Sequence, residues 1–510
     1  MSGVILAVDQ GTTGTTVALM DDRGRLLGSV NNEFPQIYVQ PGWVEHDPEA
    51  IWQSVIVGIR SLLRKRVAKA ADIVAIGITN QRETALIWDR STGMALNNAI
   101  VWQCRRTTDI CEALKQKGHE ALVKERTGLV LDPYFSATKF GWLLNNTAGI
   151  AKKLKQGRVA VGTIDSFLLW RLTGGAVHAT DASNASRTSL MNIHSGDWDE
   201  DLLKLFGVPR HILPELGPSS GLLGRTKGIP GLRDGIPISG IAGDQQSALF
   251  GQACYRPGEA KCTFGTGSFI LMNTGTQPMT SRSGLLTTVA WQLKQGGPLT
   301  YALEGGAFIC GAAVQWLRDQ LGVIKSASDI EALAASVDHS GGVEFVPAFT
   351  GLGAPYWDPE ARGLLSGLTR GTSKAHIARA TLDAMALQNA DILRAMESDL
   401  GSRMKALKVD GGAAANNLLM QLQADYLGRK LFRPRVIETT AAGACFLAGL
   451  GVGLWSTTEE IAKIWQVERE FSVILTATKR QRRIDAWQSA VARAQFPRGL
   501  EGEFQGKSDG

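Results

Sequence analysis

The chain has 510 residues, which at about 100–200 residues per domain leaves room for two to four domains and excludes a single small module. Hydrophobic residues make up 44% and charged residues 20%, a balance typical of folded globular proteins and too apolar for a disordered chain. The 54 basic and 48 acidic residues give a net charge of +6, and the basic clusters carry no interleaved aromatic residues, so no nucleic-acid partner is predicted.

Two similar hairpins are predicted, one at the head of each half of the chain. A strand, a Gly-Thr-Thr-Gly turn and a second strand occupy 4–20. The same order, with a Gly-Thr-Gly turn, occupies 260–272. The two Gly-Thr pairs start at positions 11 and 265, half a chain apart. This repeat predicts two related domains that face each other.

Helical segments alternate with short apolar runs along the rest of the chain. Asp47-Pro-Glu opens a predicted helix, and a long helix without glycine or proline is predicted after the N-cap Ser373, up to residue 400. Residues 207–243 contain nine glycines and five prolines and are expected to be mostly loop. Strands that alternate with helices predict an α/β fold. The apolar runs 73–78, 159–161, 236–241 and 407–409 are each followed by a polar cluster. Ligands bind at the carboxyl ends of strands in sheets of this kind, so these clusters are expected to line a binding site.

Several features predict a cytoplasmic protein without membrane insertion. The six cysteines show no CxxC spacing and histidines are few, which argues against a zinc site and predicts reduced thiols. The first apolar run ends at Asp9 after five residues, too short for a signal peptide. Residues 439–458 are uncharged but rich in glycine and threonine, so a buried helix is expected rather than a membrane span. Residues 496–510 are predicted to form a disordered tail.

The glycine-threonine turns are the candidate phosphate-binding elements. A Walker A loop and a GxGxxG motif are both absent from the sequence. Backbone amides in a tight glycine turn form a concave anion site, and threonine hydroxyls add donors. Asp9, two residues before Gly11, is placed to hold a magnesium ion near the phosphates. The alternative is that both turns are ordinary hairpins.

An ordered set of motifs resembles the FGGY carbohydrate kinase family, within the actin-like ATPase superfamily. The resemblance covers about residues 4–494. It implies an α/β fold of two actin-like, ribonuclease H-like domains that flank a catalytic cleft, with bounds of 1–251 and 252–495. The segments that carry it are Asp9-Gln-Gly-Thr-Thr13, Thr79-Asn-Gln-Arg-Glu-Thr84, Trp102-Gln-Cys-Arg-Arg-Thr107, Asp132-Pro-Tyr134, Gly243-Asp-Gln-Gln246, Phe264-Gly-Thr-Gly267, Gly351-Leu-Gly-Ala-Pro-Tyr-Trp-Asp-Pro359 and Val409-Asp-Gly-Gly412.

The resemblance implies a polyol site. Arg82 and Glu83 match the family's pair that binds vicinal hydroxyls, whereas a surface ion pair is the alternative from the residues alone. Trp102 and Phe269 match the apolar wall, and Tyr134 matches a hydrogen-bonding tyrosine. The segments around Arg82 and Trp102 point to glycerol within the family.

Asp244 matches the family's general base, with the neighbouring Gln245 holding the substrate. Its position after a glycine and before Gln-Gln-Ser-Ala-Leu-Phe also suits an ordinary helix N-cap, which is the alternative. Phosphoryl transfer depends mostly on positioning and charge stabilisation, so the expected role of Asp244 is orienting as much as proton-accepting.

The nucleotide site implied by the resemblance draws on both turns. Family members often carry an arginine where this chain has Thr16, so the phosphate contact of that arginine is not expected here. Asp9 would place magnesium. The positions that match nucleotide contacts are Thr12, Thr13, Gly14, Thr16, Thr266, Gly311, Gln315, Gly412 and Asn416.

The expected activity is ATP-dependent phosphorylation of glycerol to sn-glycerol 3-phosphate, by a homodimer or homotetramer. Two alternatives stay open. One is a kinase of the same family that acts on another polyol or a ketose such as a pentulose. The other is an actin-like ATPase without kinase activity, which the turns alone do not exclude.

Overall fold

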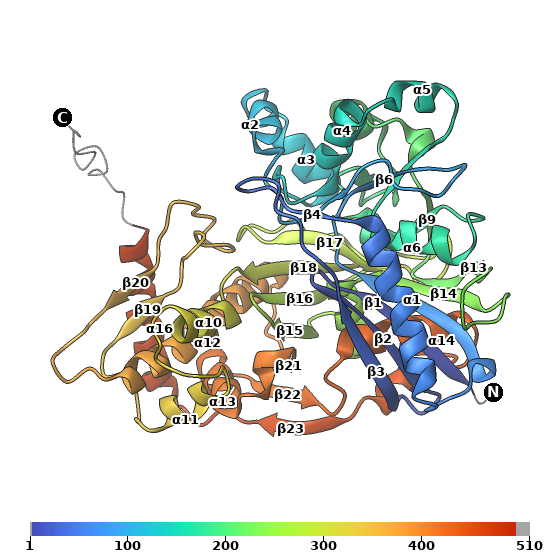
Figure 1. Cartoon of the computed structure of the whole chain (residues 1–510). Helices are drawn as coiled ribbons and strands as arrows, with labels where there is room; N and C mark the ends of the chain where they lie inside the picture. Colours follow the sequence, from blue (N-terminus) through green and yellow to red (C-terminus); the bar gives the residue numbers. More distant parts are fainter. Residues whose placement is uncertain (1–2, 496–510) are drawn as a thin grey trace.

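The computed structural model describes residues 3–495, and two large β-sheets form its framework (Figure 1). The tail predicted for 496–510 lies outside the described residues. The first sheet has the strand order β13-β14-β5-β1-β2-β3. Its strands are β1 (Val4–Gln10), β2 (Gly14–Asp21), β3 (Leu26–Glu33), β5 (Ile73–Asn80), β13 (Ser220–Arg225) and β14 (Pro237–Gly243).

The second sheet, built from the other half of the chain, has the order β17-β18-β16-β15-β21-β22-β23. In Figure 1 it runs from yellow-green and olive to orange, to the left of the blue strands of the first sheet. Its strands are β15 (Ala260–Phe264), β16 (Ser268–Gly275), β17 (Leu286–Trp291), β18 (Thr300–Ala307), β21 (Ala406–Asp410), β22 (Lys430–Pro434) and β23 (Val467–Phe471).

The two sheets share one connectivity, which confirms the internal repeat. In the first sheet, β1 pairs antiparallel with β2, β2 antiparallel with β3, β1 parallel with β5, and β5 parallel with β14. In the second, β15 and β16, β16 and β18, β15 and β21, and β21 and β22 pair in the same four ways. The predicted hairpins are therefore the equivalent first two strands of two related sheets.

Helices cover both sheets and support the predicted α/β class. α1 (Pro48–Arg64) begins where expected, with the Asp47 carboxylate accepting from the backbone N–H of Glu49, and α12 (Lys374–Leu400) begins after Ser373. The remaining helices are α2 (Thr108–Gln116), α3 (Glu120–Thr127), α4 (Ser136–Asn146), α5 (Ile150–Lys155), α6 (Ile164–Leu172), α7 (Ala182–Ala185), α8 (Glu200–Phe206), α9 (Asp244–Gly251), α10 (Gly311–Asp319), α11 (Asp329–Ala335), α13 (Asn417–Leu427), α14 (Thr439–Gly451), α15 (Thr458–Ile464) and α16 (Ala477–Ala494).

The expectation of loop over 207–243 is wrong in part. β13 and β14 lie in this segment, and β13 pairs antiparallel with β14 through an irregular register that skips from Ser220 to Gly224. Glycine inside a strand allows such a bulge, which explains why the composition resembled a loop. The short strands of the chain are β4 (Glu45–His46), β6 (Leu86–Asp89), β7 (Ala99–Ile100), β8 (Val159–Gly162), β9 (Ala179–Asp181), β10 (Met191–Asn192), β11 (Asp197–Trp198), β12 (Glu215–Gly217), β19 (Glu344–Val346) and β20 (Leu364–Ser366).

The uncharged segment from Thr439 forms α14, a buried helix as expected, which packs on α9 and on the first sheet. Glycine makes this close packing possible. A Cβ at Gly443 of α14 would lie 1.8 Å from the Ser247 carbonyl oxygen of α9, and a Cβ at Gly77 of β5 would lie 2.2 Å from the Ala444 carbonyl oxygen. No helix among residues 3–495 is long and apolar enough to cross a membrane.

Gly443→Ala tests this contact. Although alanine favours helix formation, its methyl group has no room against the Ser247 carbonyl oxygen, and overpacking of this kind costs about 1–3 kcal/mol. We expect a clear fall in the thermal unfolding midpoint. Gly371→Ala is the control, because the nearest atom to a Cβ there lies 3.8 Å away. Equal midpoints for the two variants would contradict the packing described for α9 and α14.

Candidate active site

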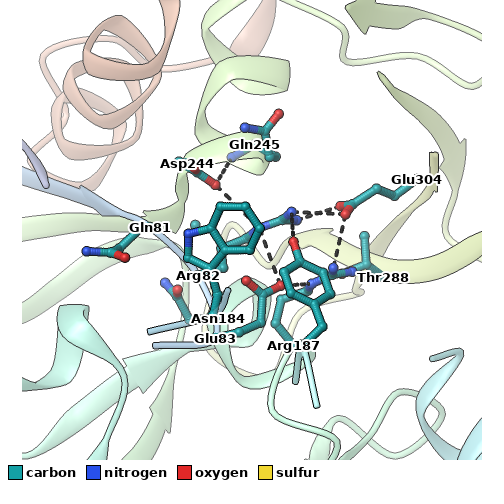
Figure 2. A network of polar contacts seen from close by, with 12 residues as sticks. Gln81, Arg82, Glu83, Asn184, Arg187, Asp244, Gln245, Thr288 and Glu304 are labelled. Carbon is teal, nitrogen blue, oxygen red and sulfur yellow. Dashed lines mark hydrogen bonds and ion pairs between the residues drawn. The ribbon is translucent and has the colours of Figure 1, made fainter. Parts of the chain in front are cut away.

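Side chains from both halves of the chain meet in one buried polar cluster (Figure 2). Arg82 and Glu83 follow β5, and Asp244 follows β14 as the first residue of α9. Glu304 lies on β18 of the second sheet, and Arg187 follows the short helix α7. The ends of the neighbouring parallel strands β5 and β14 thus bring Arg82, Glu83 and Asp244 together, as expected for such sheets.

Arg82 is the centre of the cluster. Its Nη1 and Nη2 atoms lie 2.5 and 2.9 Å from the two carboxylate oxygens of Glu304, a bidentate pair. Its Nε atom lies 3.3 Å from Oδ1 of Asp244, and Nη2 lies 3.4 Å from the Tyr134 hydroxyl. Only 2% of the Arg82 side chain is exposed, so the alternative of a surface ion pair with Glu83 is wrong.

Glu83 is held by Arg187 in an unusual backbone conformation. Arg187 donates from Nε to Glu83 Oε1 at 2.6 Å and from Nη2 to Glu304 Oε1 at 3.0 Å. The φ angle of Glu83 is +60°, and the Thr84 N–H donates to the Arg82 carbonyl oxygen at 2.7 Å across it. Positive φ at a buried glutamate is strained and persists where surrounding contacts hold it, as at binding sites.

Carboxylates outnumber guanidinium groups in the cluster. Burial tends to raise the pKa of Glu304, but the charges of Arg187 and Arg82 outweigh it and lower the pKa to about 2. Burial dominates at Glu83 and raises its pKa, against the opposing charges of Arg82 and Arg187. Two guanidinium groups therefore face three carboxylates, one of them the partly exposed Asp244. A set of this kind has no free positive charge to bind an anionic substrate.

Asp244 is not the N-cap of α9, because Gly243 occupies that position. The Asp244 carboxylate accepts from the adjacent Gln245 N–H and pairs with Arg82, and 31% of its side chain remains exposed. Asp9, at the end of β1, lies close enough for the charge of Asp244 to act on it. Burial first, and Asp244 second, raise the pKa of Asp9 to about 7.

A divalent cation suits this pair of carboxylates. Repulsion between Asp9 and Asp244 is relieved by a positive ion, and Mg²⁺ commonly takes one or two protein carboxylates together with substrate phosphates. Within residues 3–495, no group of three or more His, Cys, Asp or Glu side chains is arranged to hold a metal by itself. The donor set therefore fits an ion that arrives with a nucleotide.

Trp102, one of the two residues predicted for the apolar wall, lies beside the cluster, next to Tyr134. The rings of Trp102 and Tyr134 meet edge to face with centroids 5.5 Å apart, and both residues are half-buried. Tyr134 is positioned by its neighbours, since Asp132 accepts from its N–H at 2.8 Å and Lys139 donates to its carbonyl oxygen at 2.5 Å. Phe269 on β16 packs against Gly306 of β18, where a Cβ would lie 3.2 Å from the ring.

The first glycine turn is joined to this wall. Trp102 donates from Nε1 to the Thr12 hydroxyl at 3.0 Å, and Thr13 at the tip is exposed. The turn is closed by the Gly11 N–H, which donates to the Gly14 carbonyl oxygen. Thr16 pairs with Asp9 in the β1–β2 register, and its hydroxyl accepts from Asn31 at 2.9 Å. Thr16 thus forms a hydrogen bond with Asn31 on β3, whereas the arginine found at this position in other family members would direct a positive charge at the phosphates.

The second glycine turn contacts the segments that carry the predicted adenosine-side positions. Gly265 and Thr266 are exposed, and their carbonyl oxygens accept from the N–H groups of Gly311 and Cys310 at the start of α10. Gln315 is exposed one turn further along α10. A Cβ at Gly411 would lie 2.6 Å from the Phe264 carbonyl oxygen, so the strand end next to Gly412 also contacts this turn.

Gly412 and Asn416 belong to the 3-10 turn between β21 and α13. Apart from its two chain neighbours, no atom of residues 3–495 lies within 4 Å of a Cβ built at Gly412, so its backbone borders open space. Asn416 is the N-cap of α13, and its Oδ1 accepts from the Leu419 N–H at 2.8 Å. Its amide group keeps its donor capacity, since a capping asparagine uses only the oxygen.

Arg187 and Glu304 were not predicted as site residues. The sequence carries one usable signal, a single charged residue within the otherwise uncharged strand 300–307, because a buried carboxylate must be paired. Arg187 has no comparable local signal. It reaches the cluster from a different part of the chain, 104 residues from Glu83.

Glu304→Gln tests the pairing at the centre of the cluster. The variant leaves two buried guanidinium groups without their shared carboxylate, and loss of one partner of a buried ion pair costs about 3–5 kcal/mol. We expect a large fall in the unfolding midpoint in urea. Glu49→Gln, which breaks a half-exposed pair with Arg171, should cost under about 1 kcal/mol. A similar loss for both would show that the cluster does not stabilise the fold.

Comparison with known proteins places these features in one family. The model of the FGGY family of carbohydrate kinases matches residues 4–251 with its N-terminal domain and 260–452 with its C-terminal domain. A glycerol kinase of Bdellovibrio bacteriovorus is 59% identical over 493 residues, 97% of this chain and 99% of that protein. Glycerol kinase 2 of Thermotoga maritima is 53% identical over 491 residues, 96% of this chain and 98% of its own length.

The solved structures agree with this placement. The crystal structure of Plasmodium falciparum glycerol kinase with ADP matches at a TM-score of 0.91 and 36% identity, over 98% of this chain and 99% of that chain. Gluconate kinase from Lactobacillus acidophilus matches at a TM-score of 0.85 and 23% identity, over 97% and 98%, which shows a common fold. The two-domain, actin-like α/β fold is confirmed, and the chain belongs to the FGGY family of carbohydrate kinases.

Proposed function

We propose that this protein transfers the γ-phosphoryl group of ATP to a terminal hydroxyl of glycerol, giving sn-glycerol 3-phosphate. The observation that carries the proposal is the convergence of Arg82, Glu83 and Asp244 in one buried cluster beside an aromatic wall. The guanidinium group donates and the carboxylates accept, which suits a small molecule with adjacent hydroxyls. Near-full-length identity of 53–59% to proteins named glycerol kinase supports the same substrate.

The charge balance of the cluster favours a neutral substrate. Both guanidinium groups are paired with carboxylates, and a sugar acid would add a further negative charge beside Asp244. Glycerol carries no charge and therefore satisfies this condition.

Asp244 is the proposed general base and orienting group. Its partly exposed carboxylate accepts the proton of the attacking hydroxyl as the oxygen bonds to the γ-phosphorus and the bond to the ADP oxygen breaks. Arg82 holds the carboxylate from one side, so its direction is preset before the substrate arrives. Such positioning contributes most of the rate acceleration in phosphoryl transfer, because little proton transfer is needed to reach the loose transition state.

The two glycine turns are the proposed phosphate sites. Thr12, Thr13 and Gly14 supply donors from the first sheet, and Thr266 from the second. Gly311, Gln315, Gly412 and Asn416 form the proposed adenosine side, where the open space over Gly412 lets a nucleotide lie against the backbone. Asp9 would hold Mg²⁺, which when bound neutralises charge on the phosphates. Thr16 contributes a hydroxyl in this arrangement.

Release of ADP with a panel of acceptors tests the proposal. Wild-type protein with ATP and Mg²⁺ should release ADP rapidly with glycerol and orders of magnitude more slowly with xylulose or gluconate. Faster turnover of a ketose would favour another sugar kinase. Robust ADP release without any acceptor would favour an actin-like ATPase, and either result would overturn the proposal.

Asp244→Asn tests the catalytic assignment. The amide keeps the size of the carboxylate but cannot accept a proton as a base, so kcat should fall at least about 100-fold while glycerol still binds. Steady-state kinetics and calorimetric titration with glycerol measure the two effects. Asp47→Asn, at the start of α1, is the control and should leave kcat unchanged. An Asp244→Asn enzyme with near wild-type kcat would remove Asp244 from the chemistry.

The raised pKa of Asp9 gives a test of the metal site. The folded pKa of about 7 exceeds the unfolded value of 3.8, so ionisation of Asp9 destabilises the metal-free fold progressively between about pH 4 and 7. Asp9→Asn should therefore raise the unfolding midpoint at pH 8 without divalent cations, and this gain should vanish towards pH 4. Mg²⁺ should increase the ADP-induced rise in midpoint for wild type and for the exposed control Asp338→Asn, but not for Asp9→Asn. An equal effect of Mg²⁺ on all three would contradict the assignment of Asp9.

We also propose a cytoplasmic location and a homodimer or homotetramer. All six cysteines are buried and unpaired among the described residues, which suits a reducing compartment. Light scattering after size-exclusion chromatography gives the oligomeric state directly, and a monomer would contradict this part of the proposal.

A further inference from the structure

A buried lysine of the second sheet reaches the polyol side of the site. Lys261 lies on β15 and is 0% exposed. Its neighbours Ala260, Cys262 and Phe264 belong to the hydrophobic core of the second half. Because side chains alternate along a strand, Lys261 and Thr263 point away from the Cys262 side. A fully buried lysine is rare unless its ammonium group is paired with other polar groups.

The Lys261 ammonium group has three oxygen acceptors. It donates to Oε1 of Gln245 in a short contact, to the Thr263 hydroxyl at 2.8 Å and to the Phe269 carbonyl oxygen at 3.5 Å. Three acceptors match the three protons of an ammonium group. Burial lowers the pKa of Lys261, and the negative charges of Asp410 and Asp244 oppose that shift.

The contact with Gln245 determines which way its amide group faces. An ammonium group donates and cannot accept, so it binds only the oxygen of the amide. The Gln245 Nε2 atom makes no hydrogen bond to any described residue, and the side chain is half-buried beside Asp244. Its N–H donors are thus directed away from Lys261 and free to meet a substrate hydroxyl.

We propose that Lys261 is a positioning residue for glycerol, which acts by fixing the Gln245 amide with its N–H donors towards the substrate. Its contacts also join Thr263 to Phe269, which are paired across the β15–β16 hairpin that carries the second glycine turn. The proposal rests on glycerol as the substrate of this site. It predicts an effect on glycerol binding that passes through Gln245.

Lys261→Met removes the donors while keeping an unbranched side chain of similar length. The KM for glycerol should rise about tenfold, as expected for a lost hydrogen bond, while kcat and the KM for ATP change less than about threefold. In a Gln245→Leu background the amide is absent, so Lys261→Met should raise the KM for glycerol by less than about twofold. Should the methionine variant not fold, Lys261→Gln serves, because glutamine both donates and accepts and no longer fixes the amide.

Lys408→Met is the matched control. Lys408 lies opposite Lys261 on the neighbouring parallel strand β21, and its ammonium group donates to the carbonyl oxygens of Gln252 and Ala253 at 2.6 and 3.0 Å. It contacts no polyol-side residue, so its loss should lower the unfolding midpoint without changing the KM for glycerol.

Two results would overturn the role of Lys261 while leaving the proposed function intact. One is a fall in kcat with an unchanged KM for glycerol, which would place Lys261 at the phosphoryl group. The other is the same rise in KM with and without Gln245, which would show that the lysine does not act through the amide. Absence of glycerol phosphorylation by the wild-type protein is the distinct result that removes the proposed function itself.

Discussion

The buried ion cluster around Arg82 is the constraint on which the site depends. Charges removed from water are costly unless each has a partner, so Arg82 and Arg187 are tolerated only because Glu83 and Glu304 lie within hydrogen-bond distance. The partners come from both halves of the chain, and Arg82 and Glu304 are 222 residues apart. The site therefore forms only when the two sheets are already assembled, and its donors are held in place before any ligand binds.

The repeated fold supplies this assembly. Parallel strands β5 and β14 end at the same edge of the first sheet, which places Arg82, Glu83 and Asp244 together. Helix α9 then runs from Asp244 into close backbone contact with α14, a contact that glycine alone permits at Gly251 and Gly443. The same helix that carries the proposed base thus packs the two halves against each other. Helix α9 therefore both positions Asp244 and contributes to the packing of the whole fold.

Much of the fold follows from local patterns in the sequence. The hairpins, the helix after Asp47, the helix after Ser373 and the buried helix from Thr439 are confirmed because period, capping residues and glycine act locally. The strands within 207–243 were wrongly expected to be loop, since a bulged, glycine-rich strand resembles a loop. The site was less predictable, because the partners of Arg187 and Glu304 lie in distant segments of the chain. The contacts of Lys261 are closer in sequence, but its contact with Gln245 joins two different elements, β15 and α9. The domain bounds at 251 and 252 and the residue roles stay predictions.

The central claim is that the ion cluster around Arg82 binds a neutral triol. A crystal structure with glycerol, Mg²⁺ and a non-hydrolysable ATP analogue tests this claim most directly. The account predicts glycerol hydroxyl oxygens within about 3 Å of Arg82, Glu83 and Asp244, with the triphosphate between the turns at Thr12 and Thr266. Glycerol bound elsewhere, with the cluster closed on itself as in the free protein, would contradict it.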